Sequence, residues 1–440
     1  MTGTFVLKIL KENVPVTFIY DTLKNMKRIS IIGGGISGLA VLHYLKQRLG
    51  ESAKITLFER EAVVGGTIRS FKHGSSLFEW GPNGFLDNQP ATIQLIQELE
   101  LTDQLIEAQR TAQRRYIQIK GELLVIPAGV LDFIRTPLLP LKDKCSLIAG
   151  IFKNNISADR SIYDYVSQRF SRHIAEALVD PFISGIYAGN IKRLHMASAF
   201  PKLKRKGFKK ARMRSFRGGM GEIIEALYNR YKNHIQTNLE ISPGQINAGI
   251  IIVAAPAYAA AKIVENLNPV LAGVLGQIPY APLAVAGLLF KKSSFKKEPD
   301  GFGYLIPSKE NKDILGVLIE SNVYAYRAGT DQIMMRVMLG GAHHPAIIND
   351  EPNQILAKAI KEIDSVYGLS DNPIETFVKL WPKAIPQYET NYPQWRQSIA
   401  EISAKTPNLY LCANYLDGIS FNDCVNNAKT LANIITPSFS

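Results

Sequence analysis

Residues 29–45 read ISIIGGGISGLAVLHYL, and this stretch decides the fold. Residues 28–32, which contain three isoleucines, predict a buried strand, and residues 33–38 predict a tight glycine-rich turn. Leucines then recur at helical spacing up to Gly50, at Leu39, Leu42, Leu45 and Leu49. The stretch therefore predicts a strand, a turn and a helix in that order.

The glycines of this turn are spaced as in a dinucleotide-binding turn. Gly33 can form the turn itself, Gly35 lets the backbone approach a pyrophosphate, and Gly38 lets helix and strand pack closely. The N-terminus of the helix, which contains Ser37, then faces the phosphates, where free N–H groups favour negative charge. An ordinary glycine-rich turn is the less specific alternative.

A carboxylate follows at the expected distance. Residues 54–58 predict a second apolar strand, which ends at Glu59, 21 residues after Gly38. A carboxylate about 20 residues beyond the last glycine accepts hydrogen bonds from an adenosine ribose in dinucleotide-binding proteins. Strand, helix, strand and acid together predict that the chain binds a dinucleotide.

The length and composition of the chain indicate its domain number, its cellular compartment and the absence of a metal site. With 440 residues and 46% hydrophobic content, the chain can bury a large core and is predicted to form two or three domains. Its apolar runs are shorter than a membrane-spanning helix needs. Three cysteines, Cys145, Cys412 and Cys424, are an odd and sparse set that favours a reducing compartment such as the cytoplasm. Histidines, cysteines and carboxylates show no metal-ligand spacing, so no metal is predicted.

The net charge and the N-terminal segment indicate less about function than the glycine-rich turn does. The net charge of +13 favours acidic ligands or an anionic surface. The most basic run, residues 201–217, has few stacking aromatics, so we interpret it as a solvated connector and do not expect nucleic-acid binding. Residues 1–25 lack a secretory cleavage pattern and read as an extension before Met26.

The segment after Glu59 narrows the dinucleotide to FAD. Arg60 follows the acid, and Gly65 and Gly66 begin the sequence GGTIRS. Paired glycines at this point would let a second loop approach the same pyrophosphate. The segment resembles that of the flavoprotein superfamily of amine oxidases, phytoene desaturases and protoporphyrinogen oxidases, in which it accompanies FAD.

Later motifs resemble the protoporphyrinogen oxidase branch. FEWGPNGF at residues 78–85 is similar to the segment that lies along the flavin in that family, and DPFISGIYAGNIKRLHMASAFPKL at 180–203 is its most specific counterpart. WPKAIPQYE at 381–389 and LYLCANYLDGISFNDCVNNA at 409–428 also have family counterparts. The sequence departs from the family at Ala413, where glycine is usual, and at His195, where serine is usual.

The resemblance assigns roles to individual residues. It implies cofactor contacts in the middle of the chain at Gly81, Pro82, Asn83 and Gly84, and near adenine at Ile241. Toward the C-terminus it implies cofactor contacts at Trp381, Asn414, Gly418, Ile419 and Ser420. Gly185 and Tyr187 are expected beside the substrate, and Arg115 matches a propionate-binding arginine, although Arg114 competes for that register and a surface strand cation is an equal alternative.

The resemblance also implies the architecture. The expected fold class is α/β (α+β overall), with a Rossmann-like FAD domain built from discontinuous segments at residues 26–90, 212–262 and 404–440. An antiparallel-sheet substrate domain is expected from residues 91–125 and 263–403, and a helical subdomain from residues 126–205. Apolar residues from Ile162 to Leu178 recur at helical spacing, which predicts one buried face there.

The implied activity is FAD-dependent oxidation of protoporphyrinogen IX to protoporphyrin IX in heme biosynthesis. A hydride would pass from the porphyrinogen to flavin N5, and oxygen or another acceptor would reoxidise the flavin. Peripheral membrane contact through the helical region, at residues 127–141, is a further expectation. Three alternatives stay open: a coproporphyrinogen III oxidase on this scaffold, another flavin amine oxidase or desaturase, and a non-catalytic binder like the Rab GDP-dissociation inhibitors. Oligomeric state stays open as well.

Overall fold

A five-stranded parallel sheet forms one half of the computed structural model, which describes residues 27–74, 76–153, 156–200, 211–241 and 249–439. The predicted N-terminal extension and most of the basic run lie outside the described residues. The strand order is β10-β2-β1-β11-β17, and the neighbouring strands are all parallel. These strands are β1 (Lys27–Ile32), β2 (Ala53–Phe58), β10 (Ile235–Gln236), β11 (Ile250–Val253) and β17 (Leu409–Leu411).

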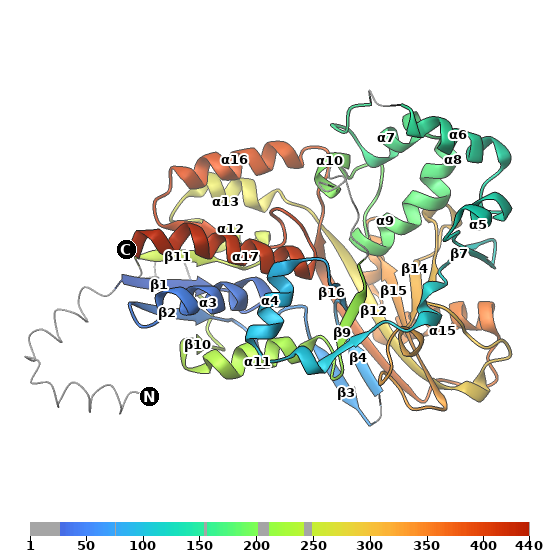
Figure 1. Cartoon of the computed structure of the whole chain (residues 1–440), viewed down its shortest axis with the longest axis horizontal. Helices are drawn as coiled ribbons and strands as arrows, with labels where there is room; N and C mark the ends of the chain where they lie inside the picture. The colour runs from blue at the N-terminus through green and yellow to red at the C-terminus, as the bar shows by residue number, and fades with distance from the viewer. Residues whose placement is uncertain (1–26, 75, 154–155, 201–210, 242–248, 440) are drawn as a thin grey trace, which may run out of the picture.

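Helices cover both faces of this sheet (Figure 1). Ile31 packs among residues of α3, α11 and α17, whereas the next residue, Ile32, packs among residues of α12 and α13, because successive side chains of a strand point to opposite faces. The helices are α3 (Ile36–Leu49), α4 (Pro90–Glu98), α11 (Gly221–Tyr231), α12 (Ala257–Val264), α13 (Pro269–Gly276), α16 (Tyr392–Ala404) and α17 (Phe421–Ile435). The predicted strand and helix are therefore confirmed as β1 and α3, but the turn is shorter than predicted, because the helix already begins at Ile36 and includes Gly38.

A seven-stranded sheet forms the other half, in the order β16-β12-β15-β14-β13-β7-β8. Its strands pair antiparallel except β13 and β7, which are parallel. Helix α15 (Pro352–Tyr367) packs its apolar face on the middle strands. The strands are β7 (Tyr116–Ile119), β8 (Glu122–Val125), β12 (Tyr280–Lys291), β13 (Gly303–Leu305), β14 (Ile314–Ile319), β15 (Gln332–Gly340) and β16 (Glu375–Pro386).

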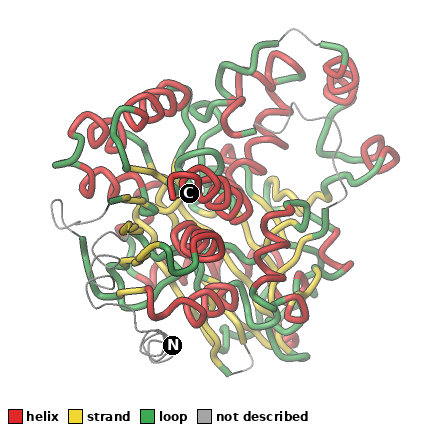
Figure 2. Tube along the Cα trace, turned by 60° about the vertical axis from the view of Figure 1, so that its left-hand side comes forward, coloured by secondary structure: helices red, strands yellow, loops and turns green. Residues whose placement is uncertain are grey.

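Small elements connect the two halves. Two short antiparallel sheets pair β3 (Ser70–His73) with β4 (Ser76–Glu79), and β9 (Met213–Phe216) with β5 (Phe85–Leu86) and β6 (Leu105–Glu107). Helix α14 (Glu320–Val323) follows β14 directly. Short 3₁₀ helices cover Thr102–Gln104, Arg110–Gln113, Lys232–His234, Lys292–Ser294, Ser308–Glu310, Pro345–Asn349 and Thr436–Phe439. Figure 2 shows that the strands lie in the interior of the molecule and that most helices lie around them.

A group of helices lies beyond the seven-stranded sheet, at the upper right of Figure 1. The helical face predicted from Ile162 onward is interrupted, because α7 ends before Phe170 and the Ser171 hydroxyl caps a new helix by accepting the N–H of Ile174. The helices are α5 (Val130–Arg135), α6 (Leu141–Ile151), α7 (Ile162–Arg169), α8 (Arg172–Ile174), a π-helical turn (Ala175–Val179), α9 (Asp180–Tyr187) and α10 (Met196–Ala199). None of the described helices is long and apolar enough to cross a bilayer.

Candidate functional site

Two glycine loops meet at the end of β1. The Gly65 N–H donates to the Gly34 carbonyl over 2.8 Å, and Gly35 and Gly65 form a parallel bridge. A Cβ built on Gly35 would meet no atom within 4 Å, and one on Gly66 would meet only the Gly35 Cα at 3.5 Å. Both backbones therefore border open space. By contrast, a Cβ on Gly38 would lie 2.0 Å from the Gly33 carbonyl oxygen, which fits the predicted close packing of helix and strand.

The N-terminus of α3 opens into this space without a protein cap. Its N-cap residue is Gly35, no side chain caps it, and its first turn contains no acid. Ser37 is buried at this end and hydrogen-bonds Cys424 of α17, which opposes the burial that raises the pKa of that thiol to about 11. The N-terminal ends of α3 and α17 thus lie together, and the N–H groups of α3 remain free for an anion.

Glu59 lies beside the first glycine loop. Its carboxylate accepts the N–H of Gly34 at 2.6 Å and the N–H of Glu61 at 2.8 Å. The backbone N–H of Leu239 donates to the Glu59 carbonyl over 3.0 Å, which brings the segment that contains the partly buried Ile241 alongside. Arg60 points to solvent and pairs with Glu61 at 3.0 Å, so its cofactor role stays a prediction.

The segment at residues 81–84 is held between the two halves of the molecule. A Cβ on Gly81 would lie 2.3 Å from the Thr67 carbonyl oxygen, and one on Gly84 would lie 2.1 Å from the Tyr324 hydroxyl. These contacts explain both glycines without a ligand. Pro82 is half-buried and Asn83 is buried, and the Asn83 amide nitrogen donates to none of the described protein atoms.

The C-terminal segment reaches the site through Tyr388. The Tyr388 hydroxyl lies 2.7 Å from the Asn414 carbonyl and accepts the N–H of Gly418 at 2.9 Å. Ser420 then caps α17 in a capping box with Asp423. Ile419 is partly buried against the helical group. Tyr388 was not predicted, although it lies in the quoted WPKAIPQYE motif.

Trp381 joins the seven-stranded sheet to the segment before Gly81. Its indole N–H donates to the Trp80 carbonyl over 3.1 Å, and the two rings lie 6.3 Å apart. The Lys379 ammonium lies 4.7 Å from the Trp80 ring and 4.8 Å from the Trp381 ring. Strand β16 thus presents a cation and one indole to the Trp80 ring, directly before Gly81.

Two of the three predicted substrate residues, Arg115 and Gly185, are exposed. Arg115 is exposed, lies 4.7 Å over the Phe302 ring and has no carboxylate partner among the described residues, whereas Arg114 pairs with Asp300 at 3.1 Å. Gly185 is exposed, and a Cβ there would lie 2.9 Å from Leu305.

Tyr187 is buried, and its place beside the substrate stays a prediction. Its ring is only 4% exposed and its hydroxyl donates to the Ala199 carbonyl, so its side chain packs in the core and does not face an open surface. The same helix exposes Phe182 and Ile186 instead, at 46% and 39%. Helical spacing places these two residues on one face with Gly185.

Comparison with known proteins now assigns the chain to a family. The sequence profile of flavin containing amine oxidoreductases matches residues 36–436. The chain belongs to this family. It is 25% identical over 457 residues to coproporphyrinogen III oxidase of Bacillus subtilis (strain 168), covering 92% of this chain and 96% of that protein. It is 22% identical over 480 residues to protoporphyrinogen oxidase 2 of Arabidopsis thaliana, covering 93% and 94%.

Solved structures share the fold. A candidate protoporphyrinogen oxidase from Exiguobacterium sp. 255-15 superimposes with a TM-score of 0.82 at 20% identity and covers 94% of this chain and 99% of that one. Reduced UDP-galactopyranose mutase superimposes with a TM-score of 0.72 at 13% identity, covering 93% and 94%. The α/β fold class and the FAD-dependent oxidoreductase class predicted from the sequence are therefore confirmed.

The residues at the glycine loops fit the FAD of this amine oxidoreductase family. Gly35 and Gly66 border open space, the N-terminus of α3 has no side-chain cap, and Glu59 lies beside the same loop, which suits the diphosphate and ribose of that cofactor. No group of three or more His, Cys, Asp or Glu side chains within the described ranges is placed to hold a metal.

A buried charge cluster that contacts residues 81–84 was not predicted from the sequence. Arg327 pairs with Glu79 at 3.1 Å, and Arg336 pairs with Glu320 at 3.0 Å. The only signal was Arg336 itself, a charge inside the apolar strand sequence QIMMRVMLG. A cation in a buried strand requires a partner, but sequence spacing does not say which one.

Glu79 makes the stability of the protein pH-dependent. Burial raises the pKa of Glu79 from 4.5 to about 7, against the opposing effects of Arg327, Ser70 and the Met220 N–H. The folded state therefore binds a proton more tightly than the unfolded state, so the contribution is largest below pH 4.5 and is lost as the pH rises through about 7. Urea unfolding should show the stability of the wild type falling by on the order of 3 kcal/mol across this interval relative to Glu79→Gln. If the unfolding free energy changed with pH equally in the wild type and in Glu79→Gln, this role of Glu79 would be contradicted.

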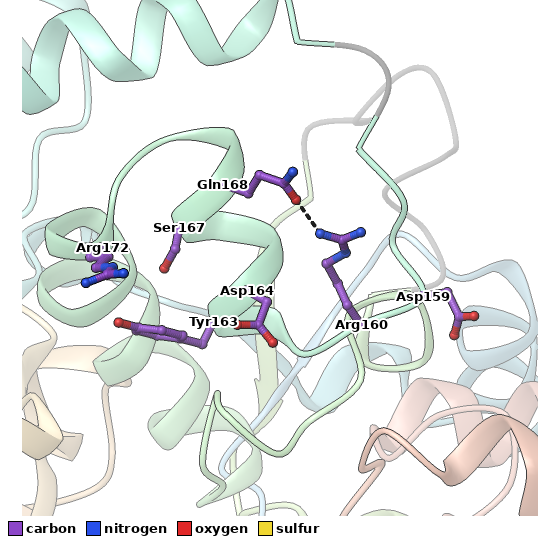
Figure 3. A pocket seen from close by; sticks show the side chains of 7 residues that line it. All are labelled: Asp159, Arg160, Tyr163, Asp164, Ser167, Gln168 and Arg172. Carbon is purple, nitrogen blue, oxygen red and sulfur yellow. Dashed lines mark hydrogen bonds between the residues drawn. The ribbon is translucent and has the colours of Figure 1, made fainter.

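A separate hollow of about 530 Å³ lies on the helical group (Figure 3). It is polar, and its walls carry charges of both signs. Its lining contains none of the predicted site residues, so we assign no part of the cofactor or substrate site to it. The lining residues are Asp159, Arg160, Tyr163, Asp164, Ser167, Gln168 and Arg172.

Proposed function

We propose that this protein oxidises a porphyrinogen to a porphyrin, with protoporphyrinogen IX as substrate and oxygen or another acceptor as oxidant. The observation that carries the proposal is the match of more than 90% of the chain to relatives named for this reaction, together with Arg115, a cation without an acid partner among the described residues. Those relatives match more than 90% of the chain, so the comparison includes the substrate half as well as the glycine loops.

The substrate would lie against the face of α9 that carries Phe182, Gly185 and Ile186. Exposed apolar side chains at Phe182 and Ile186 suit a flat tetrapyrrole, whereas the missing Cβ at Gly185 lets α9 pack closely on Leu305. Arg115 would bind a propionate carboxylate, because its guanidinium is held over Phe302 and has no carboxylate partner among the described residues. When bound, FAD supplies the ring that accepts a hydride from the substrate, and the protein supplies orientation.

Coproporphyrinogen III is the second candidate substrate. The observation that favours it is the match to a coproporphyrinogen III oxidase, at 25% identity compared with 22% for the plant protoporphyrinogen oxidase. The two substrates differ in carboxylate number, so cation placement decides between them.

Porphyrin formation by the holoenzyme in air tests both candidates. We expect protoporphyrin fluorescence to rise with protoporphyrinogen and the higher kcat/KM to belong to that substrate. A higher kcat/KM for coproporphyrinogen would replace the named substrate, and no porphyrin from either would refute the proposal.

We also propose that α5 and α6 contact an anionic membrane surface. Both helices expose apolar side chains, and Lys142 and Lys153 lie beside them. Leu141 is 77% exposed and Phe152 is 78% exposed. Further exposed members are Leu131, Ile134, Ile148 and Ile151. Exposed apolar patches rimmed by cations are typical of surfaces that bind anionic lipid.

Vesicle sedimentation tests this contact. We expect the protein to sediment with vesicles that contain phosphatidylglycerol and not with pure phosphatidylcholine, and Leu141→Gln/Phe152→Gln to lower the bound fraction several-fold. Val270→Gln is the matched control, because Val270 is 67% exposed on α13, away from this patch. Equal binding by the wild type and the double variant would contradict the proposal.

A further inference from the structure

Two arginines from the seven-stranded half contact the backbone carbonyls of the segment at residues 81–84. Arg336 of β15 donates from Nη1 to the Gly81 carbonyl. Arg327, in the loop before β15, places Nη2 3.5 Å from the Asn83 carbonyl and 2.8 Å from the Ser215 hydroxyl, to which it donates. Alternate carbonyls of one short segment are therefore fixed by two guanidinium groups.

Each guanidinium is backed by a buried carboxylate. Glu79 accepts the Met220 N–H at 2.8 Å and the Ser70 hydroxyl at 2.7 Å, while pairing with Arg327. Glu320 lies 3.0 Å from Nε of Arg336 as an ion pair without hydrogen-bond geometry, and Nη1 of the same guanidinium donates to Gly81. Arg336 thus performs two tasks with two different nitrogens, and a single ammonium group does not reproduce both.

Stability alone is a poor reason for this cluster. All four charged residues are buried, with exposures of 3% for Glu79, 0% for Arg327, 2% for Glu320 and 7% for Arg336. Removing two ion pairs from water costs free energy that their attraction barely offsets, and apolar replacements of similar volume are often as stable or more so. The cluster therefore fits a role in positioning.

The segment itself contains a buried donor without a partner among the described protein atoms. Asn83 is 8% exposed, and its amide nitrogen has no hydrogen-bond partner among the described protein atoms. A buried donor of this kind is costly unless something accepts its hydrogen bond. The carbonyl of the same residue lies toward Arg327, so the arginine fixes the backbone from which this amide projects.

We propose that Arg336 and Arg327 are positioning residues for FAD binding: they fix the backbone of residues 81–84, and that segment then contacts the cofactor. The inference rests on the proposed cofactor contact of Gly81 to Gly84. It names residues that act through the segment and do not touch the cofactor themselves.

The test compares three variants of the holoenzyme. Arg336→Met removes the donor to Gly81 and leaves Glu320 unpaired. Arg336→Met/Glu320→Leu also removes the donor but replaces the whole pair with apolar side chains, which should recover the stability lost in the single variant. Lys312→Met is the matched control, because Lys312 pairs with the buried Glu362 at 2.8 Å in the same half but does not reach residues 81–84.

The readouts are the melting temperature, the FAD dissociation constant from flavin fluorescence on dilution, and the visible circular dichroism of the bound flavin. We expect FAD to bind ~10-fold more weakly, equivalent to about 1.4 kcal/mol, in both Arg336 variants. We also expect altered flavin dichroism in both, although the double variant melts near the wild type. Lys312→Met should lower the melting temperature and leave both flavin readouts unchanged.

Recovery of both stability and FAD affinity in the double variant would overturn the proposal, since Arg336 would then act only as a buried charge. If the double variant folds poorly, Arg336→Lys replaces it: wild-type stability with weakened FAD binding supports the proposal, and wild-type values for both refute it. A wild-type protein that binds no FAD would instead refute the cofactor site itself.

Discussion

Gly35→Val is expected to give a folded protein that no longer retains FAD. Gly35 has φ −71° and ψ 177°, which any residue adopts, and a Cβ there meets no protein atom within 4 Å. The valine side chain would therefore enter the space that the diphosphate needs and would leave the fold intact. Forcing extra methyl groups into a packed site costs about 1–3 kcal/mol. We expect FAD affinity to fall by on the order of 10²-fold, measured by flavin retention on gel filtration and by titration with FAD.

Two other glycines provide the controls. Gly273→Val adds the same side chain to an exposed position of α13 where a Cβ also meets no atom within 4 Å, and it should retain FAD. Gly38→Ala should lower stability directly, because its Cβ would lie 2.0 Å from the Gly33 carbonyl oxygen. A yellow Gly35→Val protein with wild-type FAD affinity would show that the diphosphate does not lie at this loop.

Arg115→Ala should impair use of the carboxylated substrate and leave FAD binding unchanged. The guanidinium has no carboxylate partner among the described residues and is held over Phe302, so no intramolecular ion pair is lost in the variant. Truncating one member of a buried charge pair at a binding interface costs about 2–5 kcal/mol of binding free energy. Because Arg115 is exposed, we expect a loss of about 2 kcal/mol. We expect kcat/KM to fall by roughly 30-fold, mainly through KM, in steady-state assays with protoporphyrinogen.

Arg114→Ala is the matched control for this prediction. Arg114 is adjacent in sequence but already pairs with Asp300 on the surface, where such a pair contributes little to stability. Its kinetics should stay close to those of the wild type. If Arg114→Ala and not Arg115→Ala raised KM, the register predicted from the sequence would be wrong by one residue.

Local patterns in the sequence predicted the parts of the site that depend on short-range geometry. The run from β1 through α3 to β2 is specified by apolar spacing, Gly35 and Glu59, all within about 30 residues, as a βαβ unit requires. The paired glycines just after the acid predicted a second loop beside the first, and in the structure Gly65 does hydrogen-bond Gly34 of the first loop. The cofactor roles of these residues stay predictions, while their juxtaposition is a structural finding.

Other parts of the site depend on packing between distant segments. Arg327 meets Glu79 across 248 residues of sequence, the difference between positions 327 and 79, and no periodicity relates them. Tyr187 lies in a motif expected beside substrate, yet its helix turns that ring into the core and exposes Phe182 and Ile186. The apolar face predicted from Ile162 onward is interrupted by a helix break, because Ser171 forms a new N-cap there.

Anaerobic mixing of the FAD-loaded protein with protoporphyrinogen, followed by flavin absorbance in a stopped-flow instrument, tests whether the substrate reduces the flavin. We expect the oxidised flavin band to bleach in a substrate-dependent phase and the Arg115→Ala variant to bleach more slowly at equal substrate concentration. Flavin that stays fully oxidised with both protoporphyrinogen and coproporphyrinogen would contradict the proposed function.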